Sequence, residues 1–248
     1  MMSDFDFEKG EIILFDKPYQ WSSFDVVNKS RIAIKRFCNK KIKVGHAGTL
    51  DPLATGLVIV CTGAFTKKIE EIQGHVKEYI GTFTLGANRP SCDKETDVNE
   101  TFDYSHVTEN QIFEVAKSFL GEQMQVPPIF SAVKVDGVRA YRFARVNDNE
   151  DVVEPKLPPR PINIYEFEIT KINMPDVDFR IVCSKGTYIR SIARDFGTKL
   201  GCGAFLEELR RTAIGDFRVE NALDLYDFEQ LLKDVKDLNR LKALLENT

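Results

Sequence analysis

Apolar and polar residues alternate along this chain in blocks that predict both strands and helices. Residues 11–16 and 57–62 are short apolar runs of strand length, and residues 76–85 alternate apolar and polar positions among many β-formers. Ser22 with Asp25 predicts a capped helix N-terminus, and the apolar residues that follow recur at helical spacing. The N-terminal part therefore predicts a strand, a basic helix and two further strands.

The remaining chain continues this mixture of periods. The elements that it predicts are strands at residues 130–135, 162–172 and 177–183, helices at 108–120, 139–145 and 187–200, a surface loop at 147–161, and two short helices between 222 and 246. Strands outnumber long helices and often follow one another directly. This order is typical of an α+β fold and not of a doubly wound one.

Composition excludes several classes of protein. The 248 residues are 43% hydrophobic and 29% charged, which is too apolar for a disordered chain. The apolar runs are too short to cross a bilayer, and residues 1–11 are acidic, unlike a signal or transit peptide. We therefore expect a soluble, cytoplasmic protein that does not bind membranes.

Cysteine and histidine spacing gives no sign of a cofactor or metal. The five cysteines form no CxxC pair, and the three histidines are far apart in the sequence. We expect reduced, mostly buried thiols and no metal site. Phosphate-loop, nucleophile-elbow and dinucleotide signatures are also missing from the sequence.

Basic residues are segregated from acidic ones, although the net charge is −4. Seven basic residues and no acidic residue lie between Lys29 and Lys43, and two more basic regions cover 134–145 and 180–218. Such segregation is typical of a polyanion-binding face on an acidic protein. A single run of this kind is more often an ordinary solvated surface, and it is the alternation of three runs with acidic blocks that favours a binding face as much.

The loop Gly45–Gly56 has the strongest chemical signal. It reads GHAGTLDPLATG and lies between the basic helix and a predicted buried strand. Pro52 disfavours a helical conformation for Asp51, so this carboxylate is expected on an extended turn. A structural turn with Asp51 as a capping residue remains the alternative.

This loop resembles the catalytic motif of the TruB family of tRNA pseudouridine synthases. Further blocks resemble the family in the same order and cover roughly residues 10–220: Asp16-Lys17-Pro18 with Ser22-Ser23, Lys77-Glu78-Tyr79, Pro127 to Lys134 with Tyr141 to Arg145, Cys183 to Arg190, and Leu209-Arg210-Arg211. The resemblance implies a pseudouridine synthase fold, with a mixed, largely antiparallel sheet flanked by helices.

The resemblance also implies a reaction without a cofactor. Asp51 would be the catalytic aspartate that isomerises uridine-55 in the T loop of tRNA to pseudouridine, after the base is flipped out. A carboxylate can serve as nucleophile or as base in such a reaction, and the sequence leaves its first step open.

Seven residues would bind the substrate, again by resemblance: His46, Lys67, Tyr79, Asp93, Tyr188, Arg190 and Leu209. Arg190 would pair with Asp51, and the two tyrosines would orient the base. Leu209 would form a pocket wall, while His46 would fill the gap left in the RNA.

The sequence departs from the family pattern at several places. Gln20 replaces a glycine, so we expect a different turn there, and Phe130 replaces a frequent tyrosine. The usual threonines near Asp93 are missing, which puts its role in doubt. We expect a catalytic domain at 1–220 and a short helical extension at 221–248, because the 28 residues beyond Glu220 are too few for a PUA domain. The T arm would then supply recognition, for a monomer that uses no guide RNA.

Two other functions remain as alternatives. A non-catalytic RNA-binding protein could keep the basic runs and dispense with Asp51 and Arg190, yet both residues are present. An enzyme of free nucleotides would need a phosphate-binding loop and no extended basic face, and the sequence shows the reverse.

Overall fold

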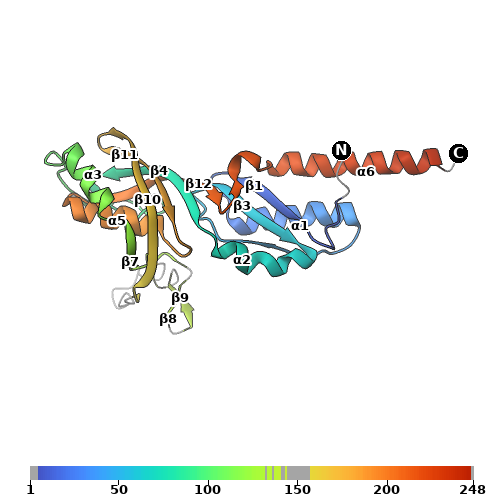
Figure 1. The fold of residues 1–248 in the computed structure, drawn as a ribbon, viewed down its shortest axis with the longest axis horizontal. Coiled ribbons are helices and arrows are strands. Elements are labelled where there is room, and N and C mark those ends of the chain that lie inside the picture. Colours follow the sequence, from blue (N-terminus) through green and yellow to red (C-terminus); the bar gives the residue numbers. More distant parts are fainter. Residues whose placement is uncertain (1–4, 132, 136, 141–142, 144–156, 247–248) are drawn as a thin grey trace. The chain divides into compact units, whose positions relative to one another are not determined.

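The computed structural model describes residues 5–131, 133–135, 137–140, 143 and 157–246, and divides the chain into two compact units (Figure 1). The first unit consists of Met1–Lys77 and Arg210–Thr248, and the second of Glu78–Leu209. Both units combine helices with strands of a mixed sheet, which confirms the predicted α+β class.

The first unit is built around three main strands. Its elements are β1 (Ile12–Lys17), α1 (Ser23–Cys38), β2 (Val44–His46), β3 (Thr55–Thr62), the 3₁₀ helix η1 (Gly63–Lys68), α2 (Ile69–Gly74), the end of β12 (Ala204–Ile214), β13 (Phe217–Arg218), η2 (Val219–Asn221) and α6 (Leu225–Glu246). The strand order is β1-β3-β12, with β2 also paired to β3 and β13 to β12. β3 runs antiparallel to β1 and parallel to β12.

Alternation along β1 explains how this sheet is buried on both faces. Phe15 points to one face and packs edge-on against Phe228 of α6, with ring centroids 5.2 Å apart. Leu14 points to the other face and joins a core cluster that includes Leu57 and Ile59 of β3. The sequence indicated β1 as a short apolar run, and the structure shows that the residues of this run alternate between two buried faces.

The second unit contains the rest of the sheet. Its elements are β4 (Lys77–Leu85), β5 (Ala87–Asn88), β6 (Glu100–Thr101), α3 (Glu109–Lys117), β7 (Gly121–Gln125), β8 (Lys134–Val135), β9 (Val138–Arg139), β10 (Arg160–Asn173), β11 (Asp176–Cys183), α5 (Ile189–Leu200) and the start of β12. The strand order within it is β12-β4-β11-β10-β7. Phenylalanine rings fill its core, where Phe83, Phe167, Phe179 and Phe196 contact one another.

Capping residues place helices α1 and α5 where the sequence predicted them. Ser22 caps α1 in a reciprocal capping box with Asp25. Gly201 ends α5 in the left-handed conformation, with φ of 74°, which glycine adopts without steric cost. The predictions of a helix after Ser22 and of a helix ending at Gly201 are therefore confirmed.

Three predicted elements differ in the structure. One helix, α6, replaces the two predicted between 222 and 246, because its apolar face continues through Leu225, Phe228, Leu232 and Val235 and no glycine or proline interrupts it. The predicted strand 130–135 is reduced to β8. The predicted surface loop 147–161 lies outside the described residues as far as 156, and residues 160–161 begin β10.

The strands that were not predicted are β2, β5, β6, β7, β9, β12 and β13. Most of the predicted helix 139–145 lies outside the described residues. No helix in the described part of the chain is long and apolar enough to span a membrane.

Candidate active site

The loop that carries Asp51 lies in the first unit, between β2 and β3. The backbone N–H of Ala47 donates to the carbonyl of Ile59 (2.9 Å), which fixes the start of the loop on β3. The N–H of Ala54 donates to the carbonyl of Asp51 (3.1 Å) and closes a turn around the aspartate. Asp51 itself is half-buried. The loop is therefore an ordered turn, as its sequence predicted.

Lys17, the last residue of β1, supports this loop from within the protein. Its side chain is fully buried, and Nζ donates to the carbonyls of Pro18 (3.0 Å), Trp21 (2.6 Å) and Pro52 (3.2 Å). Burial lowers the pKa of Lys17 to about 8, although attraction to Asp51 opposes that shift. The lysine thus joins the turn after β1 to the residue that follows Asp51.

The lowered pKa of Lys17 predicts how stability changes with pH. Between pH 8 and the ordinary lysine pKa of 10.5, the unfolded chain binds more protons at this residue than the folded chain. The contribution of Lys17 to the free energy of unfolding should therefore rise across this window, by at most about 3 kcal/mol. Urea titrations of the natural protein and Lys17→Met between pH 7 and 10.5 measure it. A difference between the two proteins that stays constant with pH would contradict the prediction.

Arg211 of β12 contacts the same loop at both ends. Its guanidinium is buried, and it donates from Nε to the carbonyl of Leu57 (2.8 Å), from Nη1 to that of Thr49 (3.2 Å) and from Nη2 to that of Gly48 (3.1 Å). Its backbone lies against Gly56, where an added Cβ would stand 2.3 Å from the Arg211 carbonyl oxygen. Gly56 also has a φ of 104°, so the loop can end here only with glycine.

The turn before α1 also holds the loop. Ser23 Oγ accepts a hydrogen bond from the N–H of Leu50 (2.8 Å) and donates to the carbonyl of the same residue (3.2 Å). The N–H of Gln20 donates to the carbonyl of Pro52 (2.9 Å). Gln20 has a φ of 66°, so it keeps the left-handed conformation that glycine favours. A conformation that glycine favours is therefore present at the position where the family pattern has glycine.

His46 is the last residue of β2 and is half-buried. Burial lowers its pKa, and the charge of Arg211 acts in the same direction. Nδ1 has no hydrogen-bond partner within the described part of the chain. An interaction with the Gly48 backbone opposes this lowering of the pKa. The imidazole ring is of a kind that can stack on a nucleic acid base.

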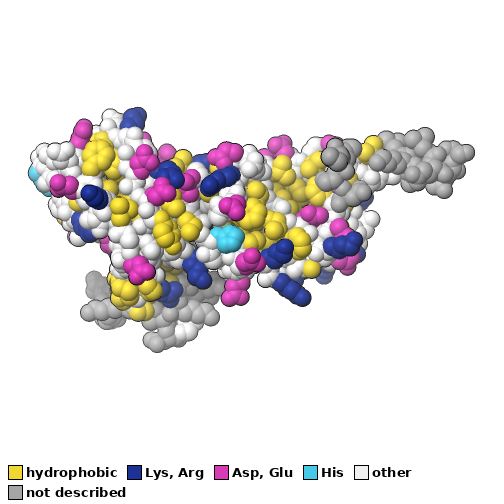
Figure 2. Space-filling view, viewed as in Figure 1, with side chains coloured by type: hydrophobic (Ala, Val, Ile, Leu, Met, Phe, Trp, Pro, Cys, Tyr) yellow, Lys and Arg dark blue, Asp and Glu magenta, His cyan; other side chains and the backbone are white. Residues whose placement is uncertain are grey.

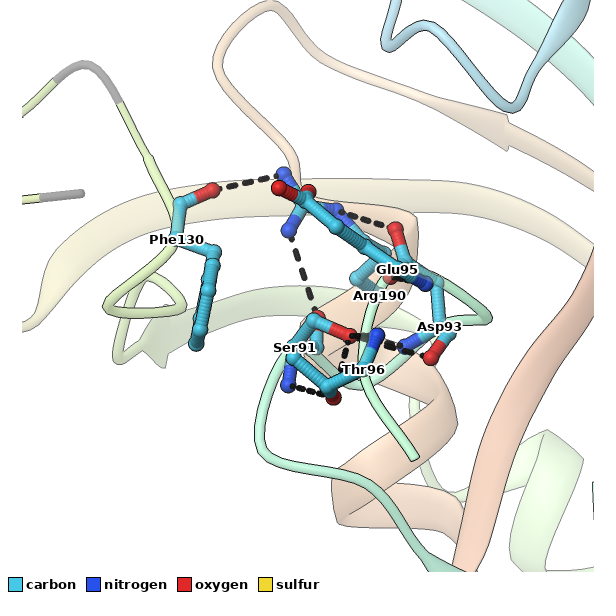
Figure 3. Close-up of polar contacts among 6 residues, drawn as sticks. All are labelled: Ser91, Asp93, Glu95, Thr96, Phe130 and Arg190. Atoms are coloured by element: carbon cyan, nitrogen blue, oxygen red, sulfur yellow. Dashed lines mark hydrogen bonds and ion pairs between the residues drawn. The ribbon is translucent and has the colours of Figure 1, made fainter. Parts of the chain in front are cut away.

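Arg190 is the centre of a second polar cluster, in the second unit (Figure 3). It lies in the first turn of α5 and is 4% exposed. Nη2 donates to the carbonyl of Phe130 (2.9 Å) and Nη1 to that of Ser91 (3.2 Å), while Nε lies 3.5 Å from Asp93 Oδ2. The predicted strand at Phe130 does not form, since this carbonyl accepts from Arg190 and the N–H of Ser131 donates to Ile129.

The segment around Asp93 is ordered by its own side chains, as Figure 3 shows. Ser91 Oγ donates to the Asp93 carbonyl (3.0 Å) and accepts from the N–H of Thr96 (3.2 Å). The N–H of Glu95 donates to Asp93 Oδ1 (3.0 Å). The carboxylate of Asp93 is thereby directed towards Arg190. Sequence reasoning had assigned Asp93 to substrate binding and had not related it to Arg190.

The other candidate residues of the second unit lie on its strands and at the start of α5. Tyr79 is buried in β4, and Leu209 lies in β12, half-buried. Tyr188 directly precedes α5, where Gln125 of β7 accepts from its N–H (2.8 Å) and donates to its carbonyl (3.1 Å). This pair of amide hydrogen bonds fixes the backbone from which the Tyr188 ring projects.

The candidate residues are divided between the units. Asp51, His46 and the exposed Lys67 of η1 belong to the first unit. The second unit holds Tyr79, Asp93, Tyr188, Arg190 and Leu209, of which Asp93 and Arg190 are in direct contact. Among the described residues, no three His, Cys, Asp or Glu side chains form a group that could hold a metal ion.

The basic helix α1 is less open than predicted. Lys29 lies 3.4 Å from Glu229 of α6 and 4.0 Å above the Tyr226 ring, so α6 covers it. Arg36 also pairs with Glu229 (3.2 Å), whereas Lys35 is exposed. Of the side chains expected to point outward, Lys35 is therefore the best available for an anion.

Most arginines of the third basic region bind other groups of the same chain. Its engaged arginines are Arg180, paired with Glu78 and Glu166, Arg194, paired with Asp195, Arg210, paired with Asp16, and the buried Arg190 and Arg211. Figure 2 shows basic and acidic side chains interspersed on the face that it presents. These arginines already have partners in the chain, so they are less available to a polyanion than the sequence indicated. In the second basic region, the structure describes only the backbone of Lys134 and Arg139.

Sequence reasoning missed Lys17, Ser23 and Arg211 as supports of the loop, although all three lie in the motifs that it quoted. The sequence did contain an indication for Lys17. It lies two residues after Phe15 and four after Ile13, so it falls on the same buried face of β1. A lysine at such a position must find several acceptors.

Comparisons with known proteins agree with this architecture. The model of the TruB family pseudouridylate synthase N-terminal domain matches residues 35–189, and that of the tRNA pseudouridylate synthase B C-terminal domain matches residues 190–247. These two matches define a pseudouridine synthase. The chain belongs to the TruB family of these isomerases.

Curated relatives share about half of its residues. A protein of Flavobacterium johnsoniae named tRNA pseudouridine synthase B is 52% identical over 234 residues, which cover 94% of this chain and 100% of the relative. A protein of the same name from Phocaeicola vulgatus is 50% identical and covers 92% of this chain and 95% of the relative.

Solved structures extend the likeness to the fold. The crystal structure of a Cbf5-Nop10-Gar1 complex contains a chain with a TM-score of 0.66 and 31% identity, over 90% of this chain and 54% of that one. A structure of an H/ACA RNP bound to a substrate RNA contains another, with a TM-score of 0.63 and 29% identity, over 90% of this chain and 53% of that one.

Proposed function

We propose that this protein converts uridine-55 in the T loop of tRNA to pseudouridine and that Asp51 is the catalytic carboxylate. The names of the relatives, tRNA pseudouridine synthase B, support tRNA as the substrate. The observation that carries the assignment of Asp51 is the number of fixed groups around its loop. Lys17, Ser23 and Arg211, all buried, bind loop backbone atoms on both sides of this one residue. Such support is what a reacting group requires.

The reaction is an isomerisation, so uridine and pseudouridine have the same composition. The bond between N1 and C1′ breaks, the base turns, C5 bonds to C1′, and the proton of C5 leaves while N1 gains one. No electrons are transferred to another molecule, so the proposed reaction uses no cofactor. Asp51 acts as nucleophile or base beside the uridine, a role that an ionised carboxylate can fill.

The proposed binding residues receive the flipped uridine. Removing a base from its stack costs a few kcal/mol, which aromatic stacking and hydrogen bonds must offset. Tyr79 and Tyr188 pack on the base and Leu209 forms a wall, while His46 occupies the space left in the RNA. Arg190 supplies positive charge to Asp51, and Lys67 and Asp93 contact the RNA. The enzyme acts as a monomer without a guide RNA.

Mapping of pseudouridine in total RNA tests the choice of substrate. A strain that lacks this gene should lose pseudouridine at position 55 of its tRNAs, and the natural gene should restore it while Asp51→Asn should not. Loss of pseudouridine at other positions only, with position 55 intact, would contradict the proposal.

An isolated T arm should be a good substrate. Because the target uridine and its folded loop are both present, a stem-loop of about 17 nucleotides should react with kcat/KM within about tenfold of whole tRNA, or about 1.4 kcal/mol. Kinetics on both RNAs at matched salt measure this ratio. A kcat/KM for the stem-loop that is about a thousandfold lower, or about 4 kcal/mol, would show that the protein also binds other parts of tRNA.

RNA binding should depend on salt through the exposed Lys35 of α1. Each phosphate that the protein neutralises contributes a slope of roughly −0.7 to −0.9 to log K against log salt. Lys35→Glu should flatten the slope by about one such contribution and raise KM more than it lowers kcat. Lys171→Glu, an equally exposed charge reversal on β10, is the matched control. Equal slopes for the two variants would leave α1 as an ordinary solvated surface.

A further inference from the structure

The two ends of the Asp51 loop meet at one buried side chain. Arg211 donates to the carbonyls of Gly48 and Thr49 before the aspartate, and to that of Leu57 after it. The Thr49 carbonyl belongs to the peptide group between Thr49 and Leu50, and Leu50 is the residue directly before Asp51. Fixing these three acceptors therefore fixes the planes of peptide groups on both sides of the aspartate.

The guanidinium is suited to this task because its donors form a rigid planar fork. Arg211 is 1% exposed, so it makes these hydrogen bonds without competition from bulk water. Bonds from an ionised donor are also roughly twice as strong as neutral ones. A lysine carries its three donor hydrogens on one nitrogen, so it could not reproduce bonds that leave Arg211 from Nε, Nη1 and Nη2.

The strand that carries Arg211 is itself held in place. Its neighbour Arg210 points to the other side of β12, as strand alternation requires, and binds Asp16 of β1 through Nη1 (2.9 Å) and Nη2 (2.6 Å). β12 also pairs with β3 at the loop end, where Arg211 is opposite Gly56. Arg211 therefore holds the loop, which has little regular structure of its own, in a defined position relative to β12.

We propose that Arg211 is a positioning residue for Asp51, which sets the rate of the isomerisation by fixing the loop and does not contact RNA. This inference rests on the proposed function of Asp51. A displacement of a reacting group by about 1 Å can cost about 100-fold in rate. The loss of Arg211 should consequently appear in the chemical step and not in RNA affinity.

Single-turnover kinetics at saturating enzyme separate these two effects. Arg211→Met should lower the rate constant by about 100-fold and Arg211→Lys by about tenfold, with Kd for the T-arm RNA within about threefold of the natural value. Ile34→Ala, a cavity variant in the core of the same unit, controls for lost stability. All proteins are compared at a temperature at which circular dichroism shows them folded, and Arg211→Lys carries the test if Arg211→Met does not fold.

A similar rate loss in Ile34→Ala and the Arg211 variants would overturn the proposal. An increased Kd with an unchanged saturated rate would also overturn it, since Arg211 would then be needed for RNA binding. Both results differ from a failure of the proposed function, which would appear as normal turnover by Asp51→Asn.

Amide hydrogen exchange tests the positioning role without any activity measurement. The N–H groups of Ala47, Leu50 and Ala54 are hydrogen-bonded in the structure and report on the order of the loop. Arg211→Met should accelerate their exchange by about tenfold or more, while the amides of α1 change little. Unchanged exchange in the loop would overturn the proposal, whatever residue performs the chemistry.

Discussion

Asp51→Asn is expected to abolish pseudouridine formation while T-arm RNA still binds within a few-fold of the natural affinity. An amide is neither a nucleophile nor a base of the required strength, so the step that Asp51 performs has no substitute. The loss should be about 10⁴-fold or more, equivalent to about 5.5 kcal/mol of transition-state stabilisation. Release of tritium from 5-tritiated uridine in a tRNA transcript measures it.

Two further variants show whether this effect is specific to Asp51. Asp216→Asn removes one acidic charge from an exposed turn of the same unit and should keep the natural rate. Asp51→Glu keeps the carboxylate but moves it by one methylene, so it should retain a small part of the rate. Turnover by Asp51→Asn near that of Asp216→Asn would assign the chemistry to another residue.

The sequence predicted best where local signals and burial agree. The box of Ser22 and Asp25 is made within one turn of α1, and the left-handed Gly201 ends α5. Both depend on interactions between residues that are close in the chain, so a single sequence contains the information. The order of family motifs also indicated the mixed sheet that the structure shows.

Prediction failed where charged residues find distant partners. β12 has few signs of a strand because Glu207, Glu208, Arg210 and Arg211 interrupt its apolar residues. In the structure Glu207 pairs with Lys94 and Arg210 with Asp16, both far away in the sequence. No local pattern reports such pairs, so the strand could not be found from periodicity.

The same reason hid the supports of the candidate site. Arg211 was counted as part of a basic surface, and the phenylalanine at position 130 as part of a strand. The first is buried by loop carbonyls, and the carbonyl of the second accepts from Arg190. The roles of Asp51 and the substrate-binding residues stay predictions. The structure shows that other residues of the same motifs, Lys17, Ser23 and Arg211, hold the Asp51 loop in place.

Arg190→Ala is expected to have the second-largest effect, on stability and on rate together. It leaves Asp93 buried without the guanidinium that lies 3.5 Å away, and it removes the donors to Ser91 and Phe130. Breaking a buried ion pair in this way typically costs about 3–5 kcal/mol of unfolding free energy. If Arg190 also supplies positive charge to Asp51, the rate should fall by about 100-fold, or about 2.7 kcal/mol.

Asp93→Asn separates these two contributions, because it weakens the same cluster but keeps the arginine. Its amide can still accept from Arg190, so we expect a smaller loss of stability than for Arg190→Ala. If Asp93 contacts flipped bases, Asp93→Asn should lower RNA affinity more than the saturated rate. Arg190→Ala should lower the saturated rate more than RNA affinity. Urea denaturation gives the stabilities, and single-turnover kinetics with binding curves give the rest. Equal rate losses in the two variants would mean that Arg190 acts only by ordering residues 91–96, since both changes would then work through the same loop.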